Sequence, residues 1–439
     1  MLKITFLGAG STIFARNVLG DCMATEALKN CDIALYDIDA LRLKESEGII
    51  NAINKGKGSP SKISCYCGVE NLEKALTGAS FVVNAVQIGG YDPATIVDFE
   101  IPKKYGLRQT IGDTLGIGGI MRALRTIPVM ETFARTMEKV CPDAWFLNYT
   151  NPMSKLTGFM QRYTGIKTVG LCHSVQGCSR SLLKNLGLED KLEGRRELIA
   201  GINHMGWLLN IYDKNGIDLY PEIRKRAKIK NELEKHNDMV RFDYIDKLGY
   251  YCTESSEHNA EYNPFYIKSK YPNLINDFNI PLDEYPRRCI KQIDEWKSEY
   301  ENLSKADALE HKRSGEYASY IMESIVTNNP YKIGGNVINN GCIENLPKEA
   351  CVEIPCLVDG SGINSCYVGK LPVQLAAMNM THVNVHLITI EAALTKKREH
   401  IYHAVMMDPH CAAELSLDDI FAMTDELLES HKIWLPEYK

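Results

Sequence analysis

Short apolar runs alternate with longer stretches of helical character over about the first 195 residues, and no other feature of this 439-residue chain constrains its fold as much. The strand-like runs are Ile4–Leu7, Ile33–Tyr36, a run near Ile63, Phe81–Ala85, Ala144–Asn148 and Thr168–Leu171. Strands that alternate with helices of about 10–20 residues form right-handed βαβ units and a parallel sheet. We therefore predict an α/β fold with a Rossmann-like, doubly wound parallel sheet in residues 1–195, which would bind NAD.

The remaining residues, 196–439, have a different texture and predict a second, α+β lobe for substrate binding, catalysis and oligomerisation. After Gly201, charged helical segments dominate, and strand-like pieces return only later. The expected helices are Glu222–Met239, Arg241–Leu248, Arg287–Leu303, Gly315–Val326 and much of the chain from Leu371; the expected strands are Lys332–Val337 and Ala350–Pro355. Ser416 to Asp419 has the sequence of a capping box for the last helix.

Composition excludes several classes of protein. The net charge is −6, so there is no basic excess to neutralise the phosphates of a nucleic acid. No apolar run approaches the roughly 18 residues that a membrane span needs, and the opening residues Met1–Phe6 have no signal-peptide pattern, so we expect a cytoplasmic protein without a membrane partner. The 14 cysteines are scattered without regular spacing or a CxxC pair, which argues against a disulfide framework.

A glycine-rich turn follows the first predicted strand. Gly8 and Gly10 would let the backbone approach a dinucleotide pyrophosphate, and Ser11 opens the next helix, whose free N–H groups and dipole favour an anion. The third glycine of the usual motif is absent, because position 13 is Ile13. Asp37 ends the second strand, where a carboxylate accepts ribose hydroxyls and repels a 2′-phosphate, which favours NAD over NADP. A packing turn without a ligand is the alternative.

Cys172 follows the strand Thr168–Leu171, and His204 comes about one element later. Ligands bind beyond the carboxyl ends of parallel strands, so the thiolate and the imidazole could meet there and hold a divalent metal with open positions for substrate oxygens. A lone cysteine and a lone histidine are more often packing residues, and spacing leaves both interpretations open.

Polar residues follow other strands on the same side of the predicted sheet. Asn148 and Asn151 could bind sugar hydroxyls or cap turns, and Asp113 could be an acid–base residue or a helix cap. The stretch Thr253–Tyr262 is rich in titratable side chains, which is compatible with an active-site loop or with exposed surface.

Together these residues resemble glycoside hydrolase family 4, the NAD- and metal-dependent glycosidases, over essentially the whole chain. Within that family the pattern is most similar to the bacterial cytoplasmic α-galactosidase branch. The motifs that carry the resemblance are Gly8–Ser11, Gln87–Tyr91, Gly118–Thr126, Asn148–Pro152, Cys172–Val175, Gly201–His204 and Leu435-Pro436.

The resemblance assigns roles to individual positions. Cys172 and His204 match the metal ligands, usually described as holding Mn²⁺, although cobalt, nickel or iron could also fit. His173 takes the place of a proposed proton donor, Tyr262 falls near the family's base, and Asp113 matches the acidic residue beside that base. The residues expected at substrate are Asn148 and Asn151, and those expected at NAD are Gly8, Gly10, Ser11, Thr12, Asp37, Asn84 and Gln87.

The activity implied is hydrolysis of α-galactosides such as melibiose by redox-assisted elimination, which is an exception to the two-carboxylate route of most glycosidases. In this scheme C3 of the sugar is oxidised, C2 is deprotonated, the aglycone leaves, water adds and C3 is reduced again. Arg287 and Arg288 could bind an anion, which keeps an α-galacturonidase or a 6-phospho-glycosidase open. An NAD-dependent sugar dehydrogenase and a non-catalytic NAD sensor are rivals from other classes, and homodimers or homotetramers are the family habit.

Overall fold

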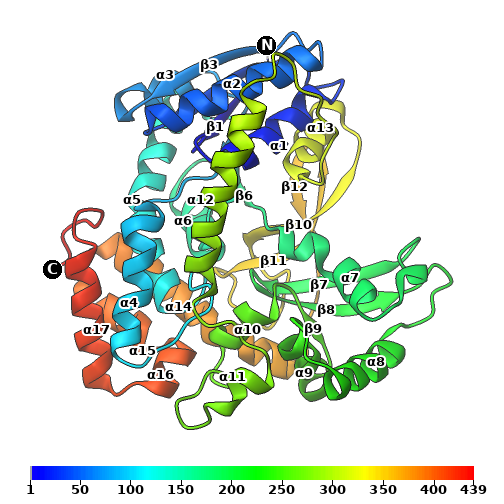
Figure 1. The fold of residues 1–439 in the computed structure, drawn as a ribbon, viewed down its shortest axis with the longest axis vertical. Coiled ribbons are helices and arrows are strands. Elements are labelled where there is room, and N and C mark those ends of the chain that lie inside the picture. The colour runs from blue at the N-terminus through cyan, green and yellow to red at the C-terminus, as the bar shows by residue number, and fades with distance from the viewer. Residues whose placement is uncertain (1) are drawn as a thin grey trace.

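A 12-stranded sheet runs through the part of the chain that this computed structural model describes, residues 2–439 without the Thr12 side chain (Figure 1). Its strands are β1 (Lys3–Leu7), β2 (Asp32–Asp37), β3 (Lys62–Cys67), β4 (Phe81–Asn84), β5 (Trp145–Asn148), β6 (Lys167–Gly170), β7 (Arg196–Ile202), β8 (Met205–Tyr212), β9 (Tyr251–Cys252), β10 (Tyr331–Ile338), β11 (Cys351–Asp359) and β12 (Gly362–Ser365). Their order is β3-β2-β1-β4-β5-β6-β10-β11-β7-β8-β9, and β12 pairs with β11.

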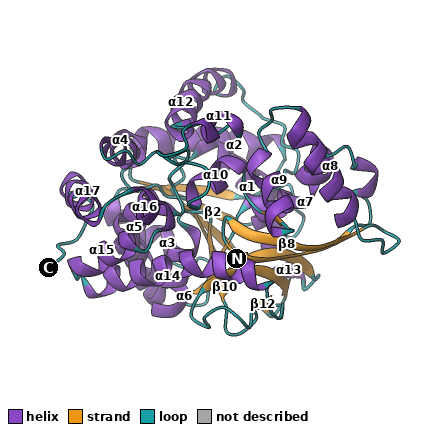
Figure 2. Cartoon of the chain, turned by 90° about the horizontal axis from the view of Figure 1, so that it is seen from below, coloured by secondary structure: helices purple, strands orange, loops and turns teal. Residues whose placement is uncertain are grey.

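Helices cover both faces of this sheet (Figure 2). They are α1 (Thr12–Met23), α2 (Ala40–Gly56), α3 (Leu72–Leu76), α4 (Ile96–Lys104), α5 (Gly116–Val140), α6 (Met153–Tyr163), α7 (His173–Asn185), α8 (Tyr220–Leu233), α9 (Met239–Leu248), α10 (Ser256–Tyr262), α11 (Asn273–Asp277), α12 (Glu284–Leu303), α13 (Tyr317–Thr327), α14 (Val373–Thr395), α15 (Arg398–Met406), α16 (Pro409–Glu414) and α17 (Leu417–Ser430). Within residues 2–439, no helix combines the length and the apolar character that a membrane crossing requires.

Strands β1 to β6 are parallel, and the predicted Rossmann-like half is confirmed. Strand β1 shows why this sheet is covered on both faces. Ile4 and Phe6 point into the core beneath α1 and α2, whereas Leu7 packs on the opposite face with α3 and α5. Because both faces are buried, β1 has no exposed polar face; even Thr5 is fully buried, and its hydroxyl donates to the Ala75 carbonyl at 2.9 Å.

The second half of the chain adds antiparallel strands to the same sheet, with β10 pairing with β6 at Asn336 and Gly170. The sheet is continuous across the boundary drawn at residue 195, and that boundary stays a prediction. Helical segments were expected to dominate after Gly201, but residues Arg196–Tyr212 form the hairpin β7–β8. The helix expected over Glu222–Met239 ends at Leu233, and the predicted cap at Ser416 is confirmed by its hydrogen bond from the Asp419 N–H.

Candidate active site

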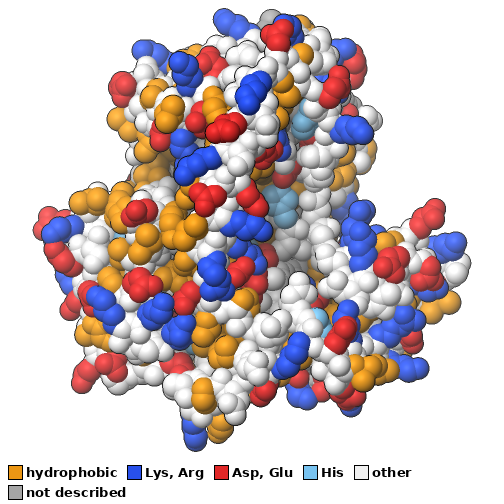
Figure 3. All heavy atoms as spheres, in the orientation of Figure 1, with side chains coloured by type: hydrophobic (Ala, Val, Ile, Leu, Met, Phe, Trp, Pro, Cys, Tyr) orange, Lys and Arg blue, Asp and Glu red, His pale blue; other side chains and the backbone are white. Residues whose placement is uncertain are grey.

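A cavity of about 280 Å³ lies where the carboxyl ends of the parallel strands meet. It extends from the glycine turn after β1 to the cysteine after β6, and its lining comprises Ser11, Phe14, Ala85, Val86, Gln87, Ile88, Asp113, Arg122, Thr126, Tyr149, Thr150, Asn151, Met153, Leu171, Cys172, His173 and Tyr285. In Figure 3 the surface is hollowed between the upper part of the molecule and the lower lobe, and histidine side chains lie in that hollow.

The glycine turn at the head of this cavity is built as a close approach of three strands. Gly8 has a φ of +83°, and a Cβ there would lie 2.8 Å from the carbonyl oxygen of Ala85. A Cβ on Gly10 would lie 2.8 Å from Asp37 Oδ2, which accepts a 2.6 Å hydrogen bond from the Gly10 N–H. Ser11 precedes α1 and lines the cavity, so the positive end of a 12-residue helix opens there.

Of the other residues expected at NAD, some lie at the cavity or the glycine turn and one is buried behind the cavity wall. Gln87 lines the cavity, and Asp37 holds the glycine turn while its other oxygen accepts the Asp39 N–H. The Thr12 side chain lies outside the described residues. Asn84 is fully buried and donates to Asn148 Oδ1 at 2.9 Å and to Thr150 Oγ1 at 3.1 Å, behind the cavity wall.

Asn148, expected at the substrate, is also fully buried, and its amide donates to the Thr150 carbonyl at 3.1 Å. Neither this side chain nor that of Asn84 is among the residues that line the cavity, and the ligand contacts expected for them stay predictions. Both amides instead join the ends of β4 and β5 and position the residues that follow. Asn151 does line the cavity, and its Oδ1 has no hydrogen-bond partner among the described residues.

The two predicted metal ligands are brought together. One ligand atom each of Cys172, His204 and Glu254 can be chosen so that all lie within 4.8 Å of one another. His204 Nε2 is 3.4 Å from Glu254 Oε2. Cys172 precedes α7, and its carbonyl oxygen accepts a 2.9 Å hydrogen bond from the Tyr317 hydroxyl, which anchors the strand end that presents the sulfur.

His204 is presented by the tight turn of the β7–β8 hairpin, with a φ of +65° that non-glycine residues rarely adopt. The preceding residue, Asn203, is fully buried and donates to Glu353 Oε1 at 3.1 Å. Asn336 donates to the same oxygen at 3.0 Å. This buried carboxyl on β11 therefore ties the turn to the centre of the sheet, and burial raises the pKa of Glu353 to about 7.

Tyr262 lies beside the metal pair. Its hydroxyl is 2.9 Å from His204 Nδ1 and 2.6 Å from His258 Nδ1. His204 thus has one ring nitrogen beside the phenol and the other beside Glu254 and Cys172, an orientation that suits a ligand bound through Nε2. Burial raises the pKa of Tyr262 well above its ordinary value, and the nearby carboxylate of Asp113 adds to the shift.

Asp113 faces this cluster rather than capping a helix, since α5 begins only at Gly116. Its Oδ1 accepts the Thr114 hydroxyl at 2.7 Å, and its Oδ2 lies 3.7 Å from Arg122 Nη1. Burial by itself would raise the pKa of this carboxyl, but the charges of Arg122 and His258 outweigh burial and leave the pKa below its ordinary value. The structure therefore favours a carboxylate at this position.

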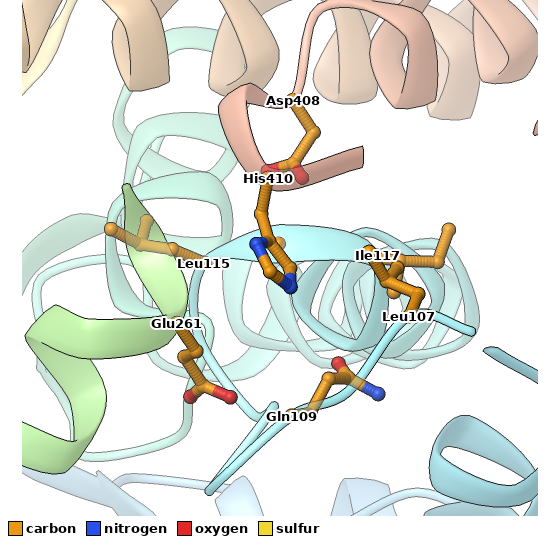
Figure 4. A pocket seen from close by; sticks show the side chains of 8 residues that line it. Leu107, Gln109, Leu115, Ile117, Glu261, Asp408 and His410 are labelled. Carbon is orange, nitrogen blue, oxygen red and sulfur yellow. The ribbon is translucent and has the colours of Figure 1, made fainter. Parts of the chain in front are cut away.

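A carboxylate from α10 fixes the loop that carries Asp113. Glu261 accepts backbone N–H groups from Thr110 at 2.7 Å, Ile111 at 3.2 Å and Gly112 at 2.9 Å. Figure 4 shows this side chain beneath the start of α5, next to a cavity of about 10 Å³, which is room for about one water molecule. We call these three hydrogen bonds to Glu261 the Glu261 clamp. Because Glu261 directly precedes Tyr262, this clamp fixes the phenol and Asp113 relative to each other.

His173 lies at the exposed side of the cavity. Its Nε2 is 2.7 Å from Glu316 Oε2, and its ring packs edge-on against Phe14 and Tyr317. The hydrogen bond that the Glu316 carboxylate accepts from His173 raises the pKa of this imidazole above its ordinary value. A half-exposed, partnered imidazole at a cavity wall can hold a proton for a leaving group.

The pKa values of Cys172 and His204 bear on how these two side chains would bind a cation. Burial raises the pKa of the Cys172 thiol, and the Glu353 and Glu254 charges raise it further. Burial lowers the pKa of His204, which keeps the imidazole neutral, the form that binds a metal. A divalent ion at the sulfur would favour the thiolate. The sulfur, nitrogen and oxygen donors within 4.8 Å fit such an ion, and the glycine turn with the opening at Ser11 fits a dinucleotide.

Three parts of the site were not singled out from the sequence: His258, Glu254 and the Glu261 clamp. All lie in the stretch Thr253–Tyr262, whose many titratable residues were compatible with either exposed surface or an active-site loop. The structure buries most of this stretch at the cluster. Glu353 was also missed, and its signal is a single acidic residue inside the apolar strand Ala350–Pro355.

The chain is similar over its full length to a curated bacterial protein. It is 57% identical over 439 residues to the alpha-galactosidase of Bacillus subtilis, which covers 100% of both chains. Residues 3–188 match the profile of family 4 glycosyl hydrolase, and residues 199–411 match that of the family 4 glycosyl hydrolase C-terminal domain.

Solved structures share the fold. The putative glucosidase lplD from Bacillus subtilis covers 98% of this chain and 100% of its own with a TM-score of 0.87 at 27% identity. A 6-phospho-beta glucosidase from Thermotoga maritima, solved with manganese, NAD+ and glucose-6-phosphate, covers 99% of this chain and 100% of its own with a TM-score of 0.80 at 22% identity. On these sequence matches and the shared fold, the chain belongs to family 4 of the glycosyl hydrolases.

Proposed function

We propose that this chain is an α-galactosidase that hydrolyses α-galactosides such as melibiose, with NAD and a divalent metal, Mn²⁺ above all, as cofactors. The observation that carries the proposal is the cluster of Cys172, His204 and Tyr262 beside a cavity that reaches the glycine turn. Cys172 lines this cavity, and His204 and Tyr262 are buried next to it. The full-length similarity to a relative named alpha-galactosidase supports the choice of substrate.

The two cofactors have separate places in this arrangement. The turn at Gly8 and Gly10 and the opening of α1 at Ser11 would hold the dinucleotide, and Cys172 with His204 would hold the metal. When bound, NAD takes up and returns a hydride of the sugar, and the metal acts as a Lewis acid, so that the proton on C2 of the oxidised sugar becomes acidic.

The chain's own residues then move protons. Tyr262 would be the base that removes the C2 proton, and its hydroxyl lies 2.9 Å from His204 Nδ1 and 2.6 Å from His258 Nδ1. Burial raises the pKa of Tyr262, and a divalent ion held by Cys172 and His204 would favour the phenolate that a base requires. His173 stands at the exposed side of the cavity, where it can protonate the departing oxygen at C1. Asp113 and Asn151 line the cavity, and they would accept sugar hydroxyls; Asn151 Oδ1 has no hydrogen-bond partner within residues 2–439. General acid–base catalysis of this kind typically contributes about 10²–10⁴-fold.

The charges near the site favour a neutral sugar over an anionic one. Arg287, which could have bound a phosphate or a carboxylate, donates to Glu284 at 2.8 Å, and Arg288 forms ion pairs with Glu284 and Glu257. Their charges are therefore compensated. A cytoplasmic location and a dimeric or tetrameric assembly, which the family resemblance implies, stay predictions.

The test is hydrolysis of p-nitrophenyl α-galactoside compared with the matching galacturonide and galactoside 6-phosphate, each with and without NAD+ and Mn²⁺. The proposal expects nitrophenol release from the neutral galactoside only when both cofactors are present. A preference for either charged analogue would assign the chain to another activity of its family. NADH that accumulates in step with product would indicate a sugar dehydrogenase.

Replacing Glu261 by glutamine is expected to lower kcat/KM about 10- to 100-fold, the range seen when groups that orient active-site residues are lost. An amide cannot accept the N–H groups of Thr110, Ile111 and Gly112 with the strength of a carboxylate. Hydrogen exchange should also speed up at these amides. The control is Glu257→Gln on the same helix, and unchanged exchange together with unchanged kcat/KM in Glu261→Gln would refute the clamp.

A further inference from the structure

Glu254 lies with the two expected metal ligands, Cys172 and His204, but no role has yet been assigned to it. It lies between β9 and α10, and β9 pairs with β8 of the hairpin that carries His204. Its φ is +61°, a left-handed conformation that non-glycine residues rarely adopt and that persists only where the surroundings impose it. The position of this carboxylate is therefore set by the fold.

The segment around Glu254 is joined to the strand after His204. The Thr253 N–H donates to the Gly206 carbonyl at 2.7 Å, and the Gly206 N–H donates to the Thr253 hydroxyl at 2.9 Å. The Ser255 N–H donates to Glu254 Oε1 at 3.0 Å. One carboxylate oxygen is thus anchored, and the other, Oε2, faces His204 Nε2 at 3.4 Å.

The spacing of the donors is compatible with a shared metal, since His204 Nε2 and Glu254 Oε2 lie 3.4 Å apart. A first-row divalent ion lies about 2.0–2.3 Å from nitrogen, oxygen or sulfur ligands, so neighbouring ligand atoms are roughly 3–4 Å apart. Ligand atoms of Cys172, His204 and Glu254 all lie within 4.8 Å of one another. The other His204 nitrogen is engaged by the Tyr262 hydroxyl, so the nitrogen facing Glu254 is the one available to a metal.

We propose that Glu254 is a third protein ligand of the metal, so that this chain holds the ion through one sulfur, one nitrogen and one oxygen before a sugar arrives. The inference rests on the proposed metal dependence. Thiolate and carboxylate together would balance the charge of a divalent ion, and the hard oxygen would improve the fit for Mn²⁺, which a soft thiolate alone suits poorly. The remaining positions stay open to oxygens of the sugar.

The experiment is Mn²⁺ binding to the full-length protein without sugar, followed by the electron paramagnetic resonance signal of free Mn²⁺. Glu254→Gln is expected to raise the Kd for Mn²⁺ at least about 10-fold. Losing a group that only hydrogen-bonds to a metal ligand already costs about that much affinity, and losing a ligand should cost no less. Glu254→Asp keeps the charge but withdraws the oxygen, and it should fall between that variant and the wild type. The control, Glu100→Gln, removes the charge of an exposed acid on α4 that lies outside the cluster, and it should bind Mn²⁺ as the wild type does.

A folded Glu254→Gln protein that binds Mn²⁺ with the wild-type Kd would overturn the proposal. If neither variant folds, a crystal structure of the wild type with Mn²⁺ and no sugar decides it: an oxygen of Glu254 within about 2.3 Å of the ion supports the proposal, and a longer separation refutes it. Since no measurement here uses a glycoside, Mn²⁺ binding that depends on Glu254 would stand even if the chain cleaved no α-galactoside.

Discussion

Cys172→Ser is expected to reduce kcat/KM for p-nitrophenyl α-galactoside about 10³-fold at saturating NAD+ and Mn²⁺. Lewis-acid stabilisation by a bound metal is worth several kcal/mol, and each 1.36 kcal/mol corresponds to a factor of ten in rate. A serine hydroxyl does not ionise near neutral pH, so it replaces the thiolate poorly. The Kd for Mn²⁺ should rise in parallel, which separates loss of the metal from loss of another function.

The fold should survive this change, because the contact that anchors the strand end runs from the Tyr317 hydroxyl to the Cys172 backbone carbonyl and not to the sulfur. Cys366→Ser, at a partly exposed thiol, is the control for general effects of removing a sulfur. A Cys172→Ser enzyme that keeps the wild-type kcat/KM would show that the sulfur does not hold the catalytic metal.

Asp98→Asn is expected to lower the free energy of unfolding by about 3–5 kcal/mol at pH 7, the usual cost of breaking a buried ion pair. Asp98 Oδ2 lies 2.6 Å from Arg125 Nη2, and its Oδ1 lies 2.8 Å from His431 Nε2. All three side chains are at most 2% exposed. The asparagine would leave the Arg125 charge buried without its partner, and that guanidinium also donates to the Ile88 carbonyl on the cavity wall.

The pH dependence of this effect has a definite sign. Burial alone would raise the pKa of Asp98, but the charges and hydrogen bonds of Arg125 and His431 outweigh it, and the pKa is lowered. The stability that Asp98 contributes is therefore complete above the ordinary carboxyl pKa of about 4 and is lost as the pH falls through the lower folded value. Denaturant titrations should show the wild-type advantage shrinking below about pH 4.

The control for Asp98 lies on the same helix. Glu100 forms an exposed pair with Lys103 at 3.3 Å, and Glu100→Gln should change stability by less than about 1 kcal/mol. Equal losses in the two variants, or an Asp98→Asn protein as stable as the wild type at pH 7, would show that the buried pair does not hold α4 and α5 together.

The sequence was most informative where structure is local. The run Ile4–Leu7 and the glycines that follow it predict a strand and a turn without reference to the rest of the chain, and the parallel half of the sheet is confirmed. The hairpin Arg196–Tyr212 was not predicted, although β7 and β8 pair mainly with each other. Its outer edges join β11 and β9, which are distant in sequence.

The site shows the same division. Cys172 and His204 were predicted to converge, and the fold brings them together because a strand end and a hairpin turn meet at one edge of the sheet. Asn84 and Asn148 follow the same rule for strand ends, yet their side chains bond to each other across β4 and β5. Glu254 and Glu261 could not be distinguished from surface acids, since their burial depends on packing against loops more than 40 residues away.

The most direct test of the account is hydrolysis in D₂O, with the released sugar examined by NMR. If Tyr262 removes the C2 proton as proposed, galactose must carry deuterium at C2, and NADH must not accumulate during steady turnover. Complete hydrolysis that leaves protium at C2 would contradict the account, because the glycosidic bond would then break without the proton transfer for which this site is arranged.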